Sequence, residues 1–532
     1  MKATYIAYKD TKSFSKLLLD YLDQKASVQP FFRNAPNLEG FAAQIADKQA
    51  HGTADRELLV DSLREQYGAL LEQSPRVAEA IESLASENTY TITTGHQLNV
   101  FTGPLYFIFK IISAIRLAQD LKAEFPDKNF VPVYWMATED HDFAEINHTR
   151  LSGKKIIWDT PAVSATGRMS TASMDVVVRT YRNFLGLSDN SEKLSRLVEE
   201  AYLGHDTLAD ATRYLVNGLF GRYGLVIIDA DRPELKRAFV PIMVQDIQQS
   251  ASHEAIIETS AQLEESGYKA QVQPREINFF YLTDSYRERI VKLDDGRYEV
   301  LRKGVYFDDD TALKEAIEAN PERFSPNVVM RPMYQEVILP NLAYIGGGAE
   351  IAYWLQPKAA FERYGLVFPI LVPRNSAIIT DDSFAVKILR LDLTFRSIFK
   401  GTEELKNEYV RRQTKHRLNL NDEWMELNAI FAKLKLRAHK IDPTLGPSTD
   451  AVKARLKKAI NNLEKKLLRA DKHNHEDALI QIERIKNHLF PGGELQERSE
   501  NFGLLYVRHG DELFEELLRH FKPLDFQFTV IY

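Results

Sequence analysis

Five apolar runs recur along the chain, and polar or glycine residues follow each of them directly. The runs are nearly continuous rather than alternating, which is typical of strands buried on both faces of a parallel sheet. Helical patterns separate them, as in βαβ units. We therefore predict an α/β fold with a Rossmann-like, doubly wound parallel sheet, whose strands end before Gly95 and lie at residues 130–137, 225–228, 342–345 and 366–372.

The residues after these strands are the candidate site. Parallel strands end at one edge of their sheet, and open α/β folds bind ligands at that edge. We expect one cleft there, formed by Gly95–Asn99, Glu139–Asp142, Asp229, Gly346–Glu350 and Arg374.

The segment 91–110, TITTGHQLNVFTGPLYFIFK, is the most informative stretch of the chain. A strand that enters a helix through a Gly/His/Gln turn presents main-chain N–H groups, an imidazole and amides to a ligand. A helix is expected to begin at Pro104, with Thr102 as its N-cap. The ligand-binding candidates here are Gly95, His96, Gln97, Asn99 and Lys110. The alternatives are an ordinary turn histidine and a snorkelling surface lysine.

Four titratable residues, Glu139, Asp140, His141 and Asp142, follow the second strand. Such a cluster after a buried strand predicts contact with a ligand or an amine, and the alternative is a helix N-terminus that carries acids. A second alternative is a metal site formed by Asp140, His141, Asp142, Glu145 and His148. No two histidines have i, i+4 spacing, so no metal is expected.

Further candidates lie in the last third of the core. Arg331 suits a carboxylate because its guanidinium can form two parallel hydrogen bonds, and a surface ion pair with Glu336 is the alternative. The three consecutive glycines permit close approach of a ligand to the main chain. The binding candidates of this region are Arg331, Gln335, Gly346, Gly347, Gly348, Glu350, Tyr353, Trp354 and Arg374.

Two regions interrupt the core and are predicted to be insertions. The first has strand-like pieces at Lys155–Trp158 and Met174–Val178, and the second has three, with Asp294–Gly296 as a hairpin turn. The predicted domains are an N-terminal helical region (1–88), core parts (89–149, 211–251, 326–395), connective insertions (150–210, 252–325), a coiled-coil domain (396–500) and a returning helix and strand (501–532).

Long helices with apolar residues at 4-3-4-3 spacing begin near Asp422 and predict an antiparallel coiled coil. Its seams contain Leu427, Phe431 and Leu434 on one helix, and Leu456, Ile460, Leu463 and Leu467 on the other. A second stripe, Val452, Ala459, Leu468 and Ile485, would face water in an isolated hairpin. We therefore predict a homodimer that forms through this arm.

Composition narrows the class of protein. The chain has 532 residues, 44% hydrophobic and 27% charged, with no cysteine, which excludes disulfides, thiolate metal sites and a cysteine nucleophile. The net charge of −7 argues against a general binder of nucleic acid or anionic membranes. No signal-peptide core or membrane-length apolar run is present, so we expect a cytoplasmic protein with no nucleic-acid or membrane partner.

The segments TTGHQLNVFTGPLY, PVYWMATEDHDFAEIN and RPMYQEVILPNLAYIGG, with the terminal coiled coil, resemble the BshC family of bacillithiol biosynthesis over nearly the whole chain. The resemblance implies a class I synthetase-like core with two connective insertions and a coiled coil. It also implies a ligase that joins cysteine to glucosaminyl malate.

Amide formation from a carboxylate requires its activation, most simply by ATP, which we expect as a possible cosubstrate. Thr93–His96 resembles the HIGH signature of class I synthetases with its first His replaced by Thr, and no KMSKS-like loop is evident. Val372–Ser376 is the nearest candidate for that loop. The predicted catalytic residues are His96, Asp140, His141 and Asp142.

Two alternatives remain open at this stage. A scaffold protein could use a degenerate synthetase-like pocket only to bind a metabolite or nucleotide. An RNA-linked synthetase relative would need a basic surface, and Lys453–Lys472 is rich in Lys and Arg, although such residues are more often a solvated helix face.

Overall fold

The computed structural model describes residues 1–52, 54–162, 164–414 and 418–532. Within it the chain forms two compact units. The first contains residues 1–378 and 494–531, and the second contains residues 379–493 with Tyr532. The second unit thus begins before the expected boundary at 396, and residues 494–500 belong to the first unit.

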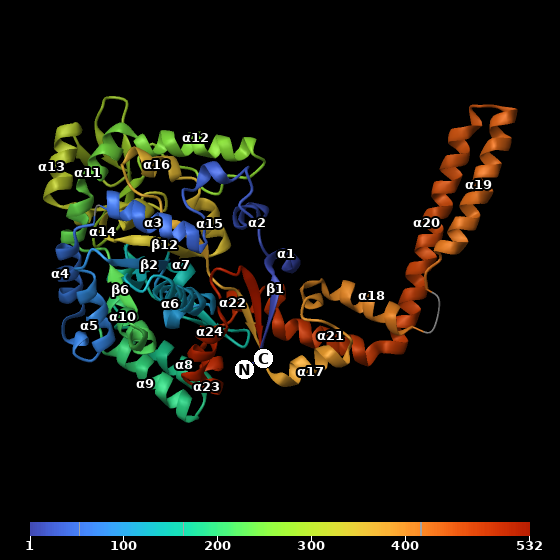
Figure 1. The fold of residues 1–532 in the computed structure, drawn as a ribbon, viewed down its shortest axis with the longest axis horizontal. Helices are drawn as coiled ribbons and strands as arrows, with labels where there is room; N and C mark the ends of the chain where they lie inside the picture. The colour runs from blue at the N-terminus through green and yellow to red at the C-terminus, as the bar shows by residue number, and fades with distance from the viewer. Residues whose placement is uncertain (53, 163, 415–417) are drawn as a thin grey trace. The chain divides into compact units, whose positions relative to one another are not determined.

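A five-stranded parallel sheet lies at the centre of the first unit (Figure 1). Its order is β13-β12-β2-β3-β6, and all of its described pairs are parallel. The strands are β2 (Thr89–His96), β3 (Asn129–Met136), β6 (Val226–Asp229), β12 (Asn341–Gly346) and β13 (Ile370–Pro373). The predicted Rossmann-like sheet, with its five strands, is confirmed.

Helices α3 (Leu38–His51) and α6 (Tyr106–Glu124) pack against this sheet. Phe41 of α3 and Leu117 of α6 are fully buried in one cluster with Ile92 and Ile345. Truncation of a fully buried leucine such as Leu117 to alanine costs about 2–5 kcal/mol. This core holds the strand ends, and therefore the candidate site, in fixed positions.

The N-terminal region is mostly helical, as predicted. Its helices are α1 (Tyr8–Thr11), α2 (Lys16–Leu22), α3, α4 (Arg56–Tyr67) and α5 (Pro75–Ser83). The predicted N-cap at Thr102 is wrong: Thr102 has a φ of 69°, and α6 begins at Tyr106. The Asn501 side chain donates to the carbonyls of Phe101 and Gly103, so a distant segment fixes this turn.

The first insertion contains the hairpin β4 (His148–Leu151) and β5 (Lys154–Ile157), followed by α8 (Asp175–Leu185), α9 (Asp189–Leu203) and α10 (Leu208–Phe220). The strand predicted at Met174–Val178 is wrong. Val177, Val178, Tyr181 and Leu185 are the buried residues of α8, and their spacing is that of a helix face.

The second insertion contains α11 (Pro233–Gln249), α12 (Ala251–Glu265) and an antiparallel sheet of order β10-β9-β8-β7-β11. The strands are β7 (Phe279–Leu282), β8 (Arg287–Lys292), β9 (Tyr298–Val300), β10 (Val305–Phe307) and β11 (Phe324–Pro326), with α13 (Asp310–Ala319) between the last two. Gly296 has a φ of 88° in the predicted hairpin turn. The chain then enters α14 (Arg331–Ile338), and α15 (Gly348–Trp354) and α16 (Lys358–Arg363) follow β12.

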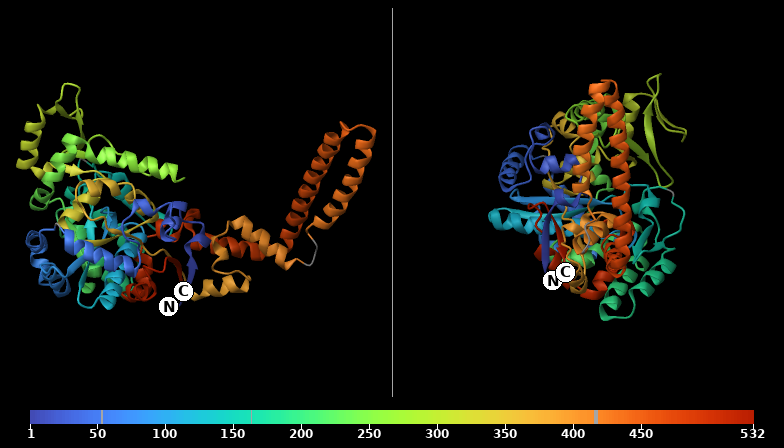
Figure 2. Two further views of the ribbon diagram at one scale, coloured as in Figure 1. Left: turned by 45° about the horizontal axis from the view of Figure 1, so that its top comes forward. Right: turned by 90° about the vertical axis from the view of Figure 1, so that its right-hand side faces the viewer.

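A smaller sheet joins distant segments. β1 (Ala3–Ala7) pairs antiparallel with β15 (Gln527–Ile531), which also neighbours β14 (Ala377–Ile379). The first and last strands lie side by side in the views of Figures 1 and 2. Before β15 the chain forms α22 (Gln496–Ser499), α23 (Gly503–His509) and α24 (Glu512–His520).

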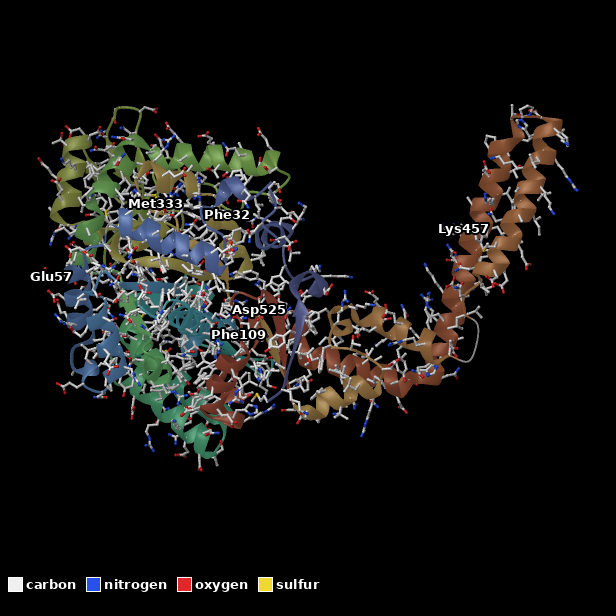
Figure 3. All side chains as sticks on the ribbon, viewed as in Figure 1. Phe32, Glu57, Phe109, Met333, Lys457 and Asp525 are labelled. Carbon is white, nitrogen blue, oxygen red and sulfur yellow. The ribbon has the colours of Figure 1, made fainter. Side chains whose placement is uncertain are left out.

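The second unit contains α17 (Asp382–Arg390), α18 (Thr402–Gln413), α19 (Asn421–Ile441), α20 (Leu445–Lys472) and α21 (Glu476–Leu489). Helices α19 and α20 pack along each other as the predicted hairpin, and their side chains, such as Lys457, surround it in Figure 3. The predicted second stripe is partly wrong. Val452 is 51% exposed, but Leu468 and Ile485 are buried, because the helices at the base of the hairpin cover them.

No helix among the residues that the structure describes is long and apolar enough to span a membrane.

Candidate active site

The strands of the parallel sheet end in register. His96 pairs with Met136, Met136 with Asp229, and Gly346 with Pro373. The residues after these positions form a cleft of about 930 Å³ at the carboxyl edge of the sheet, a size typical of small-molecule sites. Of the predicted site residues, the cleft is lined by Gly95, His96, Gln97, Lys110, Glu139, Asp140, Arg331, Gly347, Gly348, Glu350, Tyr353 and Arg374.

The other predicted site residues do not line the cleft. They are Asn99, His141, Asp142, Asp229, Gln335, Gly346 and Trp354. Asp229 accepts a hydrogen bond from Thr138 at 2.5 Å, and Trp354 stacks on Tyr344 with ring centroids 4.1 Å apart. The expectation of one shared cleft is therefore right for most of the set, and it is wrong for Asp229, Asn99, His141, Asp142 and Gly346, which do not line the cleft.

His96 is held as a neutral imidazole. Burial, together with the Lys110 and Arg374 cations, lowers the pKa of His96 to about 3. Its Nε2 atom is inaccessible and has no hydrogen-bond partner among the described residues. His96 therefore lines the cleft as a neutral ring that adds no charge to it.

This pKa predicts a specific acid sensitivity. The unfolded chain protonates His96 near 6.5, so the stability contributed by the neutral ring is complete above that pH and is lost as the pH falls toward the lower folded value. We expect the melting temperature of the parent protein to fall more steeply than that of His96→Gln between about pH 6.5 and pH 4.5. Calorimetric scans with equal slopes would contradict this prediction.

Lys110 forms a buried ion pair, so the snorkelling alternative is wrong. Its side chain is 3% exposed, and Nζ lies 2.5 Å from Glu350 Oε2. Nζ also donates to the Gly95 carbonyl at 2.9 Å. Glu350 accepts from the Tyr344 hydroxyl and the Gly347 N–H as well. Burial opposes the ionisation of Glu350, but Lys110 and the Gly347 N–H hold its pKa below the ordinary value.

The residues of the cluster at 139–142 make different contacts. Glu139 pairs with the fully buried Lys236, and burial raises the pKa of Glu139 although Lys236 opposes the rise. Asp140 accepts from Gln97 at 2.5 Å and from the His141 N–H at 2.8 Å. The His141 ring contacts Arg287, whose Nη1 lies 3.1 Å from Nδ1. Within the described ranges, no group of three or more acidic or histidine residues is arranged to hold a metal ion.

Arg331 lies among aromatic rings rather than in an ion pair. Its guanidinium carbon is 5.3–5.5 Å from the ring centroids of Trp135, Tyr344 and Trp354. Nη1 donates to Gln335, whereas Nη2 is buried without a partner among the described residues. The alternative pair with Glu336 is wrong, because Glu336 instead accepts from Lys48 at 2.6 Å.

Glu497, far from Arg374 in the sequence, holds the Arg374 side chain in place. Arg374 Nη2 donates to Glu497 at 2.7 Å, and both side chains are buried. Glu497 also accepts from the Ala377 N–H. Arg374 Nε has no partner among the residues described here.

Among the cleft-lining residues that sequence reasoning missed are Tyr106, Arg275, Arg287 and Arg498. Arg275 and Arg287 come from the second insertion, and Arg498 comes from α22, which follows the coiled coil. No strand-end signal precedes these three residues. Tyr106 lies inside the segment that was singled out, and its place just after the Gly/His/Gln turn is a signal that could have found it.

The fold and the cleft define a Rossmann-like protein with a ligand site at the carboxyl edge of its parallel sheet. Residues 1–375 match the family model "Bacillithiol biosynthesis BshC, N-terminal Rossmann-like domain", and residues 377–532 match "Bacillithiol biosynthesis BshC, C-terminal coiled-coil domain". The chain therefore belongs to the BshC family of bacillithiol biosynthesis, as its sequence segments indicate.

Curated relatives align with the chain from end to end. A protein of Flavobacterium johnsoniae is 44% identical over 532 residues and covers 100% of both chains. Proteins of Flavobacterium psychrophilum and Christiangramia forsetii are 42% and 41% identical, covering 100% of this chain and 99% of each relative. All three carry the name "Putative cysteine ligase BshC".

Proposed function

We propose that this protein is a ligase that joins the carboxylate of cysteine to the amine of glucosaminyl malate and so forms bacillithiol. The observation that carries the proposal is the full-length similarity to relatives named as cysteine ligases. The cleft supports it, because it is large enough for two small substrates and presents both cations and carboxylates.

The chemistry requires an activated carboxylate, and we propose ATP as the cosubstrate. The cysteine carboxylate attacks a phosphorus atom of ATP, and either ADP or pyrophosphate leaves. The sugar amine then attacks the carbonyl carbon, the C–O bond breaks with release of phosphate or AMP, and the amine loses a proton. Neutral His96 and the Gly95–Gln97 turn are the residues proposed to contact the phosphates.

The carboxylates and cations of the cleft fit the two substrates. Asp140 is proposed to hold the reacting amine and accept its proton, because it lines the cleft and is 31% exposed. Arg331 is proposed to bind a malate carboxylate, because Nη2 is a free buried donor and a guanidinium can form two parallel hydrogen bonds with a carboxylate. Since ATP and cysteine are cytoplasmic metabolites, we place the reaction in the cytoplasm.

The direct test is to incubate the purified protein with cysteine, glucosaminyl malate and ATP, and to detect bacillithiol by mass spectrometry. We expect product only when all three are present, and AMP or ADP identifies the activation step. Asp140→Asn is the matched inactive control. Binding of glucosaminyl malate without turnover would contradict the ligase proposal and favour a metabolite-binding scaffold.

We also propose that the hairpin arm, helices α19 and α20, mediates homodimer formation. No residue of α19 is buried within the chain. Large apolar side chains on the arm are solvent-exposed, including Met425 (68%), Leu436 (67%), Ile441 (82%) and Val452 (51%). A second copy of the arm would cover such apolar surface.

Substitution of Leu436 and Ile441 with glutamate tests this interface. Because both side chains already face solvent, the chain should fold normally, whereas a charge placed in an apolar interface opposes pairing. We expect light scattering to report a dimer for the parent and a monomer for the double variant. A monomeric parent, or a variant that stays dimeric, would contradict the proposal.

A further inference from the structure

One end of the cleft is bounded by a short segment that follows the coiled coil in sequence. Three anchors hold this segment, residues 496–501, against the first unit. Glu497 accepts from Arg374 and from the Ala377 N–H, the Glu500 carbonyl accepts from the Leu105 N–H at 2.7 Å, and the Asn501 side chain donates to two carbonyls of the 99–105 loop. The backbone of Arg498 is therefore fixed on both sides.

The side chain of Arg498 contributes nothing to this anchoring. It lines the cleft and is exposed, and it makes no hydrogen bond or ion pair within residues 1–52, 54–162, 164–414 and 418–532. Glu497, the preceding residue, is almost completely buried and satisfied. A fixed backbone that presents a free guanidinium to a cavity is the arrangement of a ligand contact rather than of a structural ion pair.

Two further donors, the Tyr106 hydroxyl and the Nε of Arg374, belong to the same cleft as Arg498. Burial raises the pKa of Tyr106, the charges of Arg374 and Arg498 oppose the rise, and those of Glu350 and Glu145 add to it. The Arg374 guanidinium carbon lies 5.2 Å from the Tyr106 ring centroid, and the His96 ring centroid lies 5.4 Å from it. The Tyr106 hydroxyl itself has no hydrogen-bond partner in the part of the chain described.

Gly347 lies beside Arg374 and Glu350 in the cleft lining. A Cβ atom there would lie 3.9 Å from Arg374 Nε and 3.3 Å from Glu350 Oε2. Arg374 Nε, which is buried and unpartnered, therefore faces the space beside Gly347. The acids nearby are already engaged: Glu350 pairs with Lys110, and Glu145 accepts from Gln97 at 2.9 Å.

We propose that Arg498, Tyr106 and the Nε of Arg374 form an anion subsite, which binds a carboxylate or phosphate group of a substrate. A guanidinium presents paired N–H donors that match either anion, and hydrogen bonds to charged groups are stronger than neutral ones. The subsite adds a binding residue set to the proposed function. Only the identity of the bound substrate rests on that function.

Two probes distinguish the two sources of the anion. L-malate supplies carboxylates and inorganic pyrophosphate supplies phosphates, and isothermal titration calorimetry measures each with the full-length protein. We expect Arg498→Ala to raise the Kd of one probe about tenfold or more, a change of about 1.4 kcal/mol. Arg498→Lys keeps the charge but lacks the paired N–H donors of the guanidinium, and it should give an intermediate Kd.

The matched control is Arg196→Ala, which removes an exposed arginine of α9 that does not line the cleft. It should leave both Kd values unchanged. The melting temperature of Arg498→Ala should equal that of the parent, because its side chain makes no hydrogen bond or ion pair among the described residues. Tyr106→Phe, which removes only the hydroxyl, is a second variant and should also weaken binding.

Loss of malate binding alone assigns the subsite to the carboxylates of the substrate, and loss of pyrophosphate binding alone assigns it to a nucleotide. The proposal is overturned if neither probe binds the parent, or if Arg498→Ala binds both probes as tightly as the parent does. A protein that binds a probe through Arg498 but forms no bacillithiol would keep the subsite and reject the ligase function.

Discussion

Glu497→Ala is expected to lower the free energy of unfolding by about 3–5 kcal/mol, because it leaves a buried guanidinium without its carboxylate. The side chains of Arg374 and Glu497 are only 5% and 1% exposed. The same change removes the acceptor of the Ala377 N–H. Urea unfolding of the variant and the parent measures the difference.

Two comparisons separate the buried charge from a general effect of substitution. Glu494→Ala, at an exposed position three residues earlier, should change stability by less than about 0.5 kcal/mol. Replacement of both Arg374 and Glu497 with methionine should recover much of the loss, since no charge stays unpaired. A loss below about 1 kcal/mol in Glu497→Ala would show that the pair does not stabilise this wall of the cleft.

Asp140→Asn is expected to reduce kcat/KM for bacillithiol formation by about 100-fold or more, which is the range for removal of a positioned general base. The fold should persist, because an amide oxygen can still accept from the His141 N–H, as Asp140 Oδ1 does. The amide cannot take the proton of the reacting amine. Steady-state kinetics and a thermal melt together measure both effects.

His141→Ala is the matched neighbour for this test. Its side chain is 47% exposed and contacts Arg287, but His141 itself does not line the cleft. We expect a loss in kcat/KM of less than about tenfold, the reduced effect of a group that does not reach the reacting atoms. If the larger loss occurs in His141→Ala, the proposed assignment of the base to Asp140 is wrong.

The strands of the core could be predicted from the sequence because buried parallel strands carry continuous apolar runs, and the polar residues after them share one edge by topology alone. That argument placed Gly95, Glu139, Gly347 and Arg374 at one cleft. It failed where a neighbour intervenes, as for Asp229, whose carboxylate bonds to Thr138.

The features that could not be predicted from the sequence depend on contacts between residues far apart in the chain. The partner of Lys110 is Glu350 and the partner of Glu336 is Lys48, and these pairs join segments hundreds of residues apart. The turn at Thr102 is bonded by Asn501 rather than by its own cap. No local pattern encodes such pairings, so the sequence could not exclude the alternative pair of Arg331 with Glu336, and it misplaced the start of α6.

The pairing of β1 with β15 affects how the protein is made. Residues 3–7 leave the ribosome early, yet their hydrogen-bond partners, residues 527–531, are translated only after the whole second unit. Contacts of such large sequence separation form late, since the loop between them must close first. Nascent chains therefore carry an unpaired strand edge and an unfinished cleft wall for most of synthesis, the interval in which a chaperone would protect them.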